Sequence, residues 1–412
     1  MAETYNGEPL IVGAPNSPVS LAPEDSRIES GFRGNNGYNA FRQSNVCGIG
    51  ITCANRRPIV YAPGNGGMLH AFDWSTGEEL WGFVPPQLLS NFVEIESGEP
   101  GSSRSIFAVD ATPVSKDVLI NGQWRTVLFG NLGRGGKGFF VLDITNPDQP
   151  AHLFSIENDS VNDVVHRWNA EGVLRSFPYE SGITPPPASD YSRLGETWSE
   201  PVIINAHVNG TVRNLAVFGG GYNNKVDSDI GDRLYAVDLA EEGDITFQWS
   251  VASSGTSYGP IANAIPASPV AVTTDAVLAS ENFDYGAIIY VGDLAGRIWK
   301  FDLTGQITSF QNRQRLIFDG AATVENGRYI FNRIAPTVNA DGEVVLTFGT
   351  GDIDELSSGG STVNNYYAGI VDNNFPSLIP TEPTVSFSDL QDVTTTATAT
   401  CPLEEGRPGW SY

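Results

Sequence analysis

The sequence lacks any long apolar segment. None of its 412 residues belongs to an uninterrupted apolar run of 18 or more, so no segment is predicted to cross a bilayer and no direct membrane insertion is expected. The opening residues "MAETYNGEPL" contain neither a basic nor an apolar stretch, so they do not form a signal peptide. If the protein is exported, we expect Met1 to mark a fragment or a mature piece with an added start.

Basic residues are scarce relative to acidic ones. The chain has 23 Lys and Arg against 48 Asp and Glu, which gives a net charge of −25. A surface of this sign repels phosphate backbones and anionic headgroups, so nucleic acid is not an expected partner. Carboxylates also bind hard cations, although most of them serve as a solvated surface.

Cysteine is limited to Cys47, Cys53 and Cys401. The first two lie six positions apart in "VCGIGITC", and no further Cys or His nearby completes a zinc site. We predict a disulfide between Cys47 and Cys53, which implies an oxidising compartment, with Cys401 free or paired outside this segment. The chain has only four histidines, so Ser-His-Asp catalysis is not expected.

Glycine and proline are abundant, and one phrase recurs. With 45 Gly, 26 Pro and 10% aromatic residues, the composition favours many turns between short strands over disorder. The phrase is a β-branched or aromatic run, a Gly turn, a second apolar run and an aspartate. Each aspartate is expected to cap the following turn as an Asx acceptor. The five copies end at Asp73, Asp143, Asp238, Asp302 and Asp372.

A shorter, proline-containing phrase precedes four of the five copies. Its forms are "DATPV", "WSEPV", "PASPV" and "IAPTV", which begin at Asp110, Trp198, Pro266 and Ile334. Proline is tolerated at the start of a strand, so each phrase is predicted to open the first strand of its unit.

These repeats predict an all-β fold, a β-propeller of at least five repeats with long inserted loops. A single four-stranded sheet cannot cover both of its faces, whereas radial packing of sheets covers them and leaves short edges. The alternative is an array of β-sandwiches, which does not require the same phrase in every unit. Tryptophans such as Trp81 and Trp299 are expected to pack between sheets.

The stretch "AFDWSTGEELW" resembles the repeat of quinoprotein propellers, the pyrroloquinoline-quinone dehydrogenases. Those enzymes need a central cofactor, a calcium ion and a catalytic carboxylate. The adjacent cysteine pair typical of many of them is missing from this sequence. A quinoprotein-type enzyme is therefore kept as the alternative function.

A series of longer phrases follows in order along the chain. They are "VGAP", "RRPIVY", "NGGMLHAFDWSTGEELWGFVP", "WRTVLFGNLGRGGKGFFVLDIT", "TWSEPVI", "VFGGGYN", "ASPVAV", "YVGDLAGRIWKFDL" and "FGTG". Together these phrases resemble a different family, the PilC/PilY type IV pilus tip adhesins and assembly factors. The resemblance is to their C-terminal propeller, with quinoprotein-like blades, and it runs across nearly the whole chain. It implies one propeller domain over residues 1–412, possibly a fragment of a longer protein, without the family's N-terminal adhesive half.

This resemblance implies a non-enzymatic protein that supports pilus assembly, retraction control and surface attachment. The implied location is extracellular, at the pilus tip or the outer cell surface. The implied partners are minor pilins of the tip complex and a receptor on a host cell or an abiotic surface. The family also implies modulation by Ca²⁺.

Two acidic segments are candidates for that calcium. In the family a calcium loop precedes "YVGDL"; here the alternating acidic pattern is broken, and an ordinary polar turn is the alternative. The oxygen donors of this segment are Asp275, Glu281, Asn282 and Asp284. The second segment, "NNKVDSDIGD", carries Asp227, Asp229 and Asp232. Three carboxylates so close repel one another unless an ion such as Ca²⁺ neutralises them. Lys225 and Arg233 could do the same, which leaves an exposed acidic loop as the alternative.

Three further segments carry expectations about loops and ends. "GNLGRGGKGFF" lacks the Ser or Thr of a phosphate loop and runs into a strand, so it is predicted to be a hairpin turn. The polar insertions 156–197 and 251–266 are predicted to be loops available for partner contacts, with insertions that the fold simply tolerates as the alternative. A Gly-Trp pair near the C-terminus resembles one that opens a further strand in the family. We therefore expect either a fragment or a ring closed by "EPLIVGAP" beside the last repeat.

Overall fold

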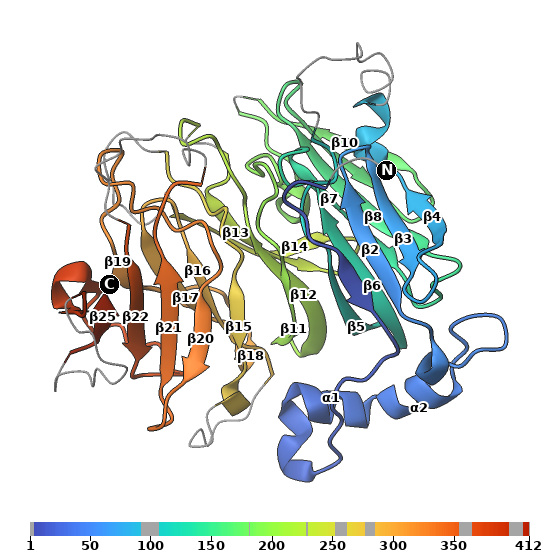
Figure 1. Ribbon diagram of the computed structural model, residues 1–412, viewed down its shortest axis with the longest axis horizontal. Helices are drawn as coiled ribbons and strands as arrows, with labels where there is room; N and C mark the ends of the chain where they lie inside the picture. The colour runs from blue at the N-terminus through green and yellow to red at the C-terminus, as the bar shows by residue number, and fades with distance from the viewer. Residues whose placement is uncertain are drawn as a thin grey trace.

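The computed structural model describes residues 4–91, 107–180, 182–227, 230–251, 262–276, 285–353, 365–394 and 407–411. These residues form five mainly antiparallel β-sheets that stand side by side in an arc (Figure 1). The predicted all-β propeller fold is confirmed.

The first two sheets come from the N-terminal part of the chain. The first contains β1 (Leu10–Val12), β2 (Ile59–Gly64), β3 (Met68–Asp73) and β4 (Glu79–Phe83). The second contains β5 (Val114–Ile120), β6 (Gln123–Asn131), β7 (Gly138–Asp143), β8 (Ala151–Asp159), β9 (Val164–Trp168) and β10 (Leu174–Pro178). The hairpin β9–β10 widens this second sheet to six strands. The prediction of a loop over 156–197 is therefore wrong for this part, because the β-branched and aromatic residues of "VVHRW" and "LRSF" pair as strands.

In the other three sheets the strands do not simply follow the order of the chain. The third contains β11 (Val202–Val208), β12 (Thr211–Gly219), β13 (Arg233–Asp238), β14 (Asp244–Ser250) and β18 (Gln306–Ile307). The fourth contains β15 (Val270–Val272), β16 (Ile288–Gly292), β17 (Arg297–Asp302), β19 (Gln314–Asp319) and β23 (Val385–Ser386). The fifth contains β20 (Ala335–Val338), β21 (Val344–Gly349), β22 (Tyr367–Asp372), β24 (Gln391–Asp392) and β25 (Gly409–Ser411). Because β18 follows β17 in the chain but pairs with β11, it ties the fourth sheet to the third.

Each long repeated phrase forms a hairpin that ends in an Asx turn. The five hairpins are β2–β3, β6–β7, β12–β13, β16–β17 and β21–β22. In every copy Oδ1 of the terminal aspartate accepts a hydrogen bond from the backbone N–H two residues later, over 2.8 to 3.2 Å. The predicted capping role of the aspartates is confirmed.

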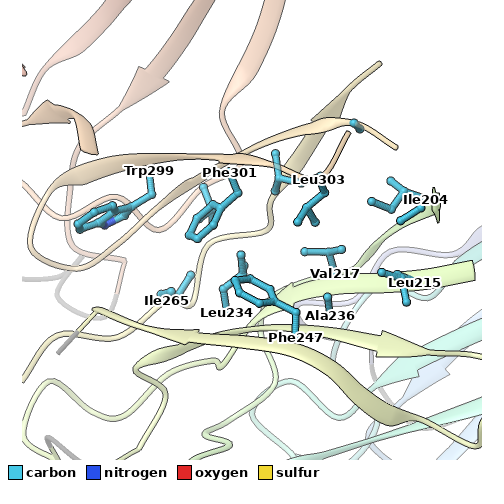
Figure 2. Packing of buried hydrophobic residues seen from close by; sticks show 14 of the residues in the cluster. Ile204, Leu215, Val217, Leu234, Ala236, Phe247, Ile265, Trp299, Phe301 and Leu303 are labelled. Atoms are coloured by element: carbon cyan, nitrogen blue, oxygen red, sulfur yellow. The ribbon is translucent and has the colours of Figure 1, made fainter. Parts of the chain in front are cut away.

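The core lies between neighbouring sheets. Side chains alternate along β13, so Leu234 and Ala236 pack toward the fourth sheet while Tyr235 and Val237 pack toward the second. Figure 2 shows the first of these interfaces, where Trp299 and other side chains of the fourth sheet meet those of the third. Each large apolar side chain buried there contributes about 1.5–3 kcal/mol to folding. Trp299 thus packs between sheets as predicted, and Trp81 lies partly buried between the first and second sheets.

A helical insertion covers one end of the propeller. Helices α1 (Glu29–Asn35) and α2 (Tyr38–Ser44) lie between β1 and β2 in the sequence. Their aromatic side chains surround Trp124 of β6, and the rings of Tyr38 and Trp124 lie 4.8 Å apart. Cys47 and Cys53, the predicted pair, form a disulfide next to this cluster. The described part of the chain has no helix that is both long and apolar enough to cross a membrane.

Six short 3₁₀ helices complete the described structure. They are η1 (Pro23–Arg27), η2 (Cys53–Asn55), η3 (Pro86–Asn91), η4 (Pro187–Ser189), η6 (Thr274–Ala276) and η7 (Phe387–Asp389).

The expected closure of the ring by the N-terminal strand is wrong. Strand β1 pairs with β2 of the first sheet, with Leu10 opposite Tyr61, and no described strand of the fifth sheet pairs with it. Val12 of this strand joins the core at the first sheet and Leu10 packs partly buried against it, whereas Ile11 is exposed. The Gly-Trp pair does begin a strand, because β25 pairs with β22 in the fifth sheet.

Candidate functional site

A central cavity lies where the proline-containing phrases meet. It has a volume of about 640 Å³ and is lined by residues that immediately precede β5, β11, β15 and β20. The four strands face the middle of the arc (Figure 1), and β11 contacts β15, which in turn contacts β20. The short repeats therefore open the inner strands, as predicted, and bring four segments distant in sequence to one place.

Arg134 enters the cavity from the turn between β6 and β7. Gly133 has a φ of +60°, and a Cβ there would lie 2.8 Å from the backbone of Asp110. Glycine therefore allows the turn to approach the start of β5. The guanidinium carbon of Arg134 lies 5.0 Å from the ring centre of Trp198 and 5.6 Å from that of Phe107. Both distances fit cation–π contacts, which hold the planar group in place.

The aromatic wall of the cavity is packed within the protein. The indole of Trp198 lies 4.5 Å from the ring of Tyr222 and 6.1 Å from that of Phe331, centre to centre. Its Nε1 donates a hydrogen bond of 3.0 Å to Glu196. Because Tyr222 and Phe331 are buried, this wall is a fixed surface.

The two carboxylates that line the cavity have partners. Asp110 accepts hydrogen bonds from the backbone and the side chain of Asn6, at 3.2 and 2.5 Å, and from Asn65 at 3.3 Å. Glu200 pairs with Arg333 at 2.8 Å near the solvent, where the Arg333 side chain is 44% exposed. The cavity is thus lined by two arginines and by two carboxylates that already have hydrogen-bond or ion-pair partners. The whole chain, in contrast, has about twice as many acidic as basic residues.

Hydrogen bonds of Asn131, Ser199 and Ser268 connect neighbouring sheets around the cavity. The Asn131 side chain donates to the carbonyl of Ser199 over 2.7 Å, and the Ser199 hydroxyl donates to the carbonyl of Ala267 over 2.9 Å. The backbone N–H of Glu200 donates to the Ser268 hydroxyl over 3.0 Å. These bonds join the second, third and fourth sheets. Buried polar groups that are satisfied in this way hold one arrangement of the sheets.

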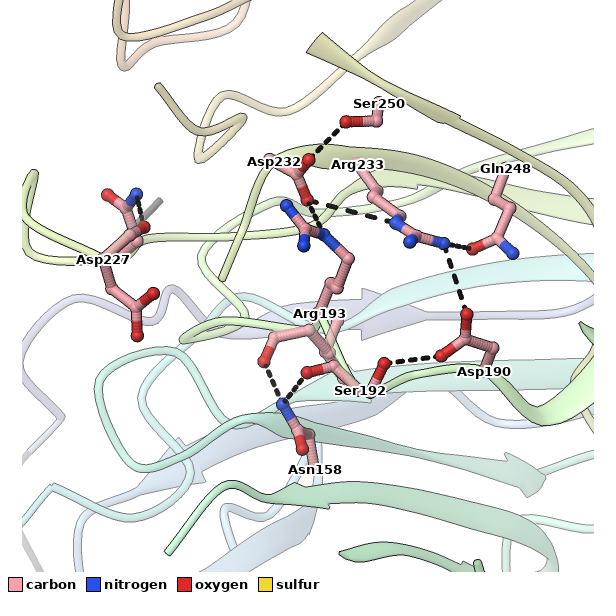
Figure 3. A network of polar contacts seen from close by, with 11 residues as sticks. Asn158, Asp190, Ser192, Arg193, Asp227, Asp232, Arg233, Gln248 and Ser250 are labelled. Carbon is pink, nitrogen blue, oxygen red and sulfur yellow. Dashed lines mark hydrogen bonds and ion pairs between the residues drawn. The ribbon is translucent and has the colours of Figure 1, made fainter. Parts of the chain in front are cut away.

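Asp232, one of the predicted calcium ligands, is committed to other partners. Its carboxylate is 1% exposed, and Oδ1 accepts a hydrogen bond of 2.7 Å from Nε of Arg193. Oδ2 accepts one from Ser250, and Nε of Arg233 lies 4.0 Å away (Figure 3). Arginine side chains therefore compensate this charge, and a calcium ion would have to displace Arg193 to reach it.

The other predicted calcium ligands do not gather around Asp232. The exposed side chain of Asp227 points away from it (Figure 3), and Asp229 lies outside the described residues. Asp275 is exposed on η6. Within the described ranges no three His, Cys, Asp or Glu side chains are placed to hold a metal ion. Glu281, Asn282 and Asp284 lie outside the described residues, and calcium binding there stays a prediction.

A family model and curated relatives both point to the PilY1 propeller. A model of the PilY1 β-propeller domain matches residues 38–175. The chain carries a PilY1-type β-propeller. It is 32% identical over 250 residues to the type IV pilus biogenesis factor PilY1 of Pseudomonas aeruginosa strain UCBPP-PA14, over 61% of this chain and 17% of that protein. It is 29% identical over 302 residues to a PilY1 homolog of Xylella fastidiosa, over 73% of this chain and 19% of that protein.

A solved structure has the same PilY1-type fold. The crystal structure of the Pseudomonas aeruginosa PilY1 C-terminal domain superimposes with a TM-score of 0.61 and 24% identity, over 93% of this chain and 68% of that one. The chain spans only 17 to 19% of the length of the two curated relatives.

Sequence reasoning did not identify the cavity of this PilY1-type propeller. Its signals are the proline phrases and the Gly133–Arg134 pair, which by sequence alone predict only strand starts and a hairpin turn. The hairpin itself is confirmed by the pairing of β6 with β7. The cavity was missed because its lining residues come from four separate repeats.

Proposed function

We propose that this propeller is a non-enzymatic binding module of a type IV pilus biogenesis factor. In this proposal it supports pilus assembly, retraction control and surface attachment from the pilus tip or the outer cell surface. Its partners are minor pilins of the tip complex and a receptor on a host cell or an abiotic surface. The observation that carries the proposal is the match to the PilY1 propeller, whose relatives are named as type IV pilus biogenesis factors.

The central cavity supports binding over catalysis. Asp110 and Glu200 are held by side chains of the protein, and no His or Cys belongs to the described residues that line the cavity. The quinoprotein alternative predicts dye-linked alcohol oxidation by the purified chain after incubation with pyrroloquinoline quinone and Ca²⁺. We expect no such turnover, and its observation would overturn the non-enzymatic assignment.

Calcium modulation belongs to this proposal and has its own test. Because Asp232 does not fit as a ligand, we expect a calcium ion to use Asp227 with Asp229, or Asp275 with the residues that follow it. A ligand that binds only the folded state stabilises it, so added Ca²⁺ should raise the melting temperature and chelation should lower it. Asp227→Ala and Asp275→Ala should weaken this response, with the exposed Asp341→Ala as the control. An unchanged melting temperature in calcium and in chelator contradicts calcium binding.

The function itself is tested in the cell that encodes the chain. Deletion of the whole gene should abolish or strongly reduce surface pili and twitching, and the intact gene should restore them. A gene that lacks only the segment for this propeller should fail to do so, while its product is still detected with an antibody. Normal piliation and twitching without the propeller would refute the proposal.

A further inference from the structure

We propose that the outer edge of strand β10 binds an extended segment of another protein, which joins the second sheet as a further strand. The segment carries one acidic side chain between two apolar ones. This surface belongs to the hairpin β9–β10, none of whose residues lines the central cavity. The inference goes beyond the proposed function, because neither its argument nor its test depends on a role in pili.

Strand β10 has a backbone that is open on one side. It is the last strand of the second sheet, and no described strand pairs with its outer side (Figure 1). The carbonyl of Val173 and the N–H of Tyr179, which flank β10, are hydrogen-bonded to the residues that flank β9, over 3.2 and 2.8 Å. Because backbone direction alternates along an antiparallel strand and the register has no shift, Leu174 and Ser176 point their N–H and C=O groups away from β9.

The residues of β10 agree with this orientation. Pro178 occupies the next outward position, where a missing N–H removes no hydrogen bond to β9. The side chain of Leu174 is 47% exposed, and Arg175 and Ser176 are exposed as well. The edge therefore offers solvent the N–H and C=O groups of two residues, followed by a proline that limits the length of any added strand.

The same propeller covers other sheet edges with short added strands. Strands β18 and β23, of two residues each, come from distant parts of the chain and pair in parallel with β11 and β19. Addition of a strand to an open edge is also a recurring way in which proteins bind extended peptides. The outer edge of β10 has the length for such an addition, and its unpaired groups match the backbone of an extended chain.

A second copy of this chain fits the edge poorly. Two-fold pairing of β10 with itself has three registers that use its outward groups. A centre at Arg175 places two arginines opposite each other, where like charges repel. A centre at Ser176 pairs Leu174 with Pro178, which lacks an N–H. A centre at Leu174 pairs Ser176 with Gly172, whose N–H is already bonded within the hairpin turn. The expected occupant is therefore a different chain.

Arg175 selects the central side chain of the added segment. It lies opposite Arg167 of β9, and Arg167 is compensated by Asp244 at 2.8 Å. Arg175 itself forms no ion pair with any described residue, although it lines a cavity of about 410 Å³ on this face of the hairpin. The residue opposite Arg175 on an added strand lies within reach of the guanidinium, so an acidic side chain there forms a cross-strand ion pair.

The two flanking side chains of the segment lie on the other face of the sheet. Side chains alternate along a strand, so they neighbour Leu174 and Ser176. Leu174 lies opposite Trp168 of β9 in the register, and Trp168 is itself only partly buried. Apolar side chains on the segment would cover Leu174, which favours β-branched residues on both sides of the acidic one.

Hydrogen exchange followed by NMR tests the open edge. In the purified chain the amides of Leu174 and Ser176 should exchange faster than those of Arg175 and Phe177, which point toward β9. The probe is the peptide acetyl-Thr-Val-Glu-Val-Thr-amide at millimolar concentration, and it should slow exchange at Leu174 and Ser176. The matched control carries N-methyl groups on both valines and cannot donate to β10. No protection by the probe, or equal protection by the N-methylated peptide, overturns the proposal.

Variants of Ser176 locate the binding edge. Ser176→Pro removes an outward N–H and places a ring on the edge, so it should weaken peptide binding about tenfold or more. Ser176→Ala is the matched control, because it keeps the N–H and loses only the hydroxyl that contacts His166. Melting curves verify that both variants are folded, and the N-methylated peptide keeps the test valid if Ser176→Pro is not. Unchanged affinity in a folded Ser176→Pro protein refutes the assignment.

A charge exchange tests the acidic side chain. The peptide acetyl-Thr-Val-Lys-Val-Thr-amide should bind the wild type about threefold or more weakly than the glutamate peptide. In Arg175→Glu this preference should reverse. The control is Arg333→Glu, which changes the charge of an exposed arginine that lies outside the hairpin. Equal binding of the two peptides, or an unchanged preference in Arg175→Glu, contradicts the acidic requirement.

Sedimentation of the purified chain distinguishes a partner from a second copy. We expect a monomer over the concentration range of the binding experiments. A dimer that dissociates in Ser176→Pro would make a second copy the occupant and overturn the inference. These measurements do not depend on piliation. Peptide binding with normal pili in the strain that lacks the propeller would refute only the proposed function, and loss of pili without peptide binding would refute only this inference.

Discussion

The first and the fifth repeats end in equivalent aspartates that have different surroundings. Oδ1 of Asp73 and Oδ1 of Asp372 both accept a hydrogen bond from the backbone of the next turn. Oδ2 of Asp73 pairs at 2.7 Å with Arg57, whose side chain is 40% exposed. Oδ2 of Asp372 pairs at 2.7 Å with Lys300, whose side chain is 2% exposed. The same local turn is thus combined with a surface ion pair in one repeat and a buried one in the other.

The second pair also connects two sheets. Lys300 lies on β17 and Tyr290 on β16 of the fourth sheet, and the Tyr290 hydroxyl donates a hydrogen bond of 2.5 Å to Asp372 of the fifth. Burial, and then the charge of Asp372, raises the pKa of the tyrosine far above its usual range. Arg57, in contrast, lies just before strand β2 of the same sheet that contains Asp73. Burial between sheets therefore gives a residue that caps a local turn a second role as an inter-sheet contact. Substitutions at Lys300, Asp372, Asp143, Arg57 and Asp73 test the difference between the buried and the exposed ion pair.

The largest effect is expected at Lys300. Lys300→Met removes the cation and leaves the carboxylate of Asp372 buried beside an apolar side chain. Breaking a buried ion pair in this way costs about 3–5 kcal/mol. The free energy of unfolding, measured by denaturant titration, should fall by this amount.

A double variant separates the charge from the packing. Lys300→Met combined with Asp372→Asn removes both charges and keeps an acceptor for the turn, so much of the lost stability should return. If Lys300→Met alone costs less than about 1 kcal/mol, typical of an exposed pair, the contrast with Asp73 is wrong.

A smaller effect is expected when the turn acceptor is removed. Asp143 accepts a hydrogen bond of 2.9 Å from the backbone N–H of Thr145. By analogy with helix caps, Asp143→Ala should lower the free energy of unfolding by about 1 kcal/mol. Asp143→Asn keeps an oxygen acceptor and should cost less. Equal losses for Ala and Asn would show that pairing with Arg125, and not the turn, dominates at this position.

Removal of the exposed cation in the first repeat should matter less. Arg57→Met breaks the contacts with Asp73 and Asp148. Exposed pairs contribute about 0–1 kcal/mol, and the remaining Asx turn is intact. Denaturant titration at low and high salt should show a small loss that shrinks as salt rises. A loss as large as that of Lys300→Met would remove the distinction between the two repeats.

The smallest effect concerns pH. Hydrogen bonds from the Ser75 hydroxyl and backbone, with help from Thr76 and Arg57, lower the pKa of Asp73 to about 2. Because the folded value lies below the unfolded one of about 3.9, the ionised carboxylate stabilises the fold above about pH 4, and this contribution is lost as the pH falls toward 2. The stability difference between the wild type and Asp73→Asn should therefore shrink between pH 4 and pH 2. A constant difference over that range contradicts the lowered pKa.

The sequence by itself determined the repeating unit. Alternating apolar residues, glycine turns and terminal aspartates act over a few neighbouring residues, so the hairpins, the Asx turns and the propeller fold could be predicted from it. The close spacing of Cys47 and Cys53 is likewise a local property. The predicted loop over 156–197 failed where β-branched residues paired as strands, and α1 and α2 were missed because their stability comes from packing against Trp124.

Only the tertiary structure decided what lies next to each repeat. The sequence could not indicate that β1 would join the first sheet, or that Arg193 would neutralise Asp232 across 39 positions. Nor could it place Arg134 beside Trp198, or Asp372 beside Lys300, since these residues are far apart in the chain and meet only when sheets pack. Contacts within a hairpin follow from adjacent residues, whereas those between sheets depend on how the buried faces fit together.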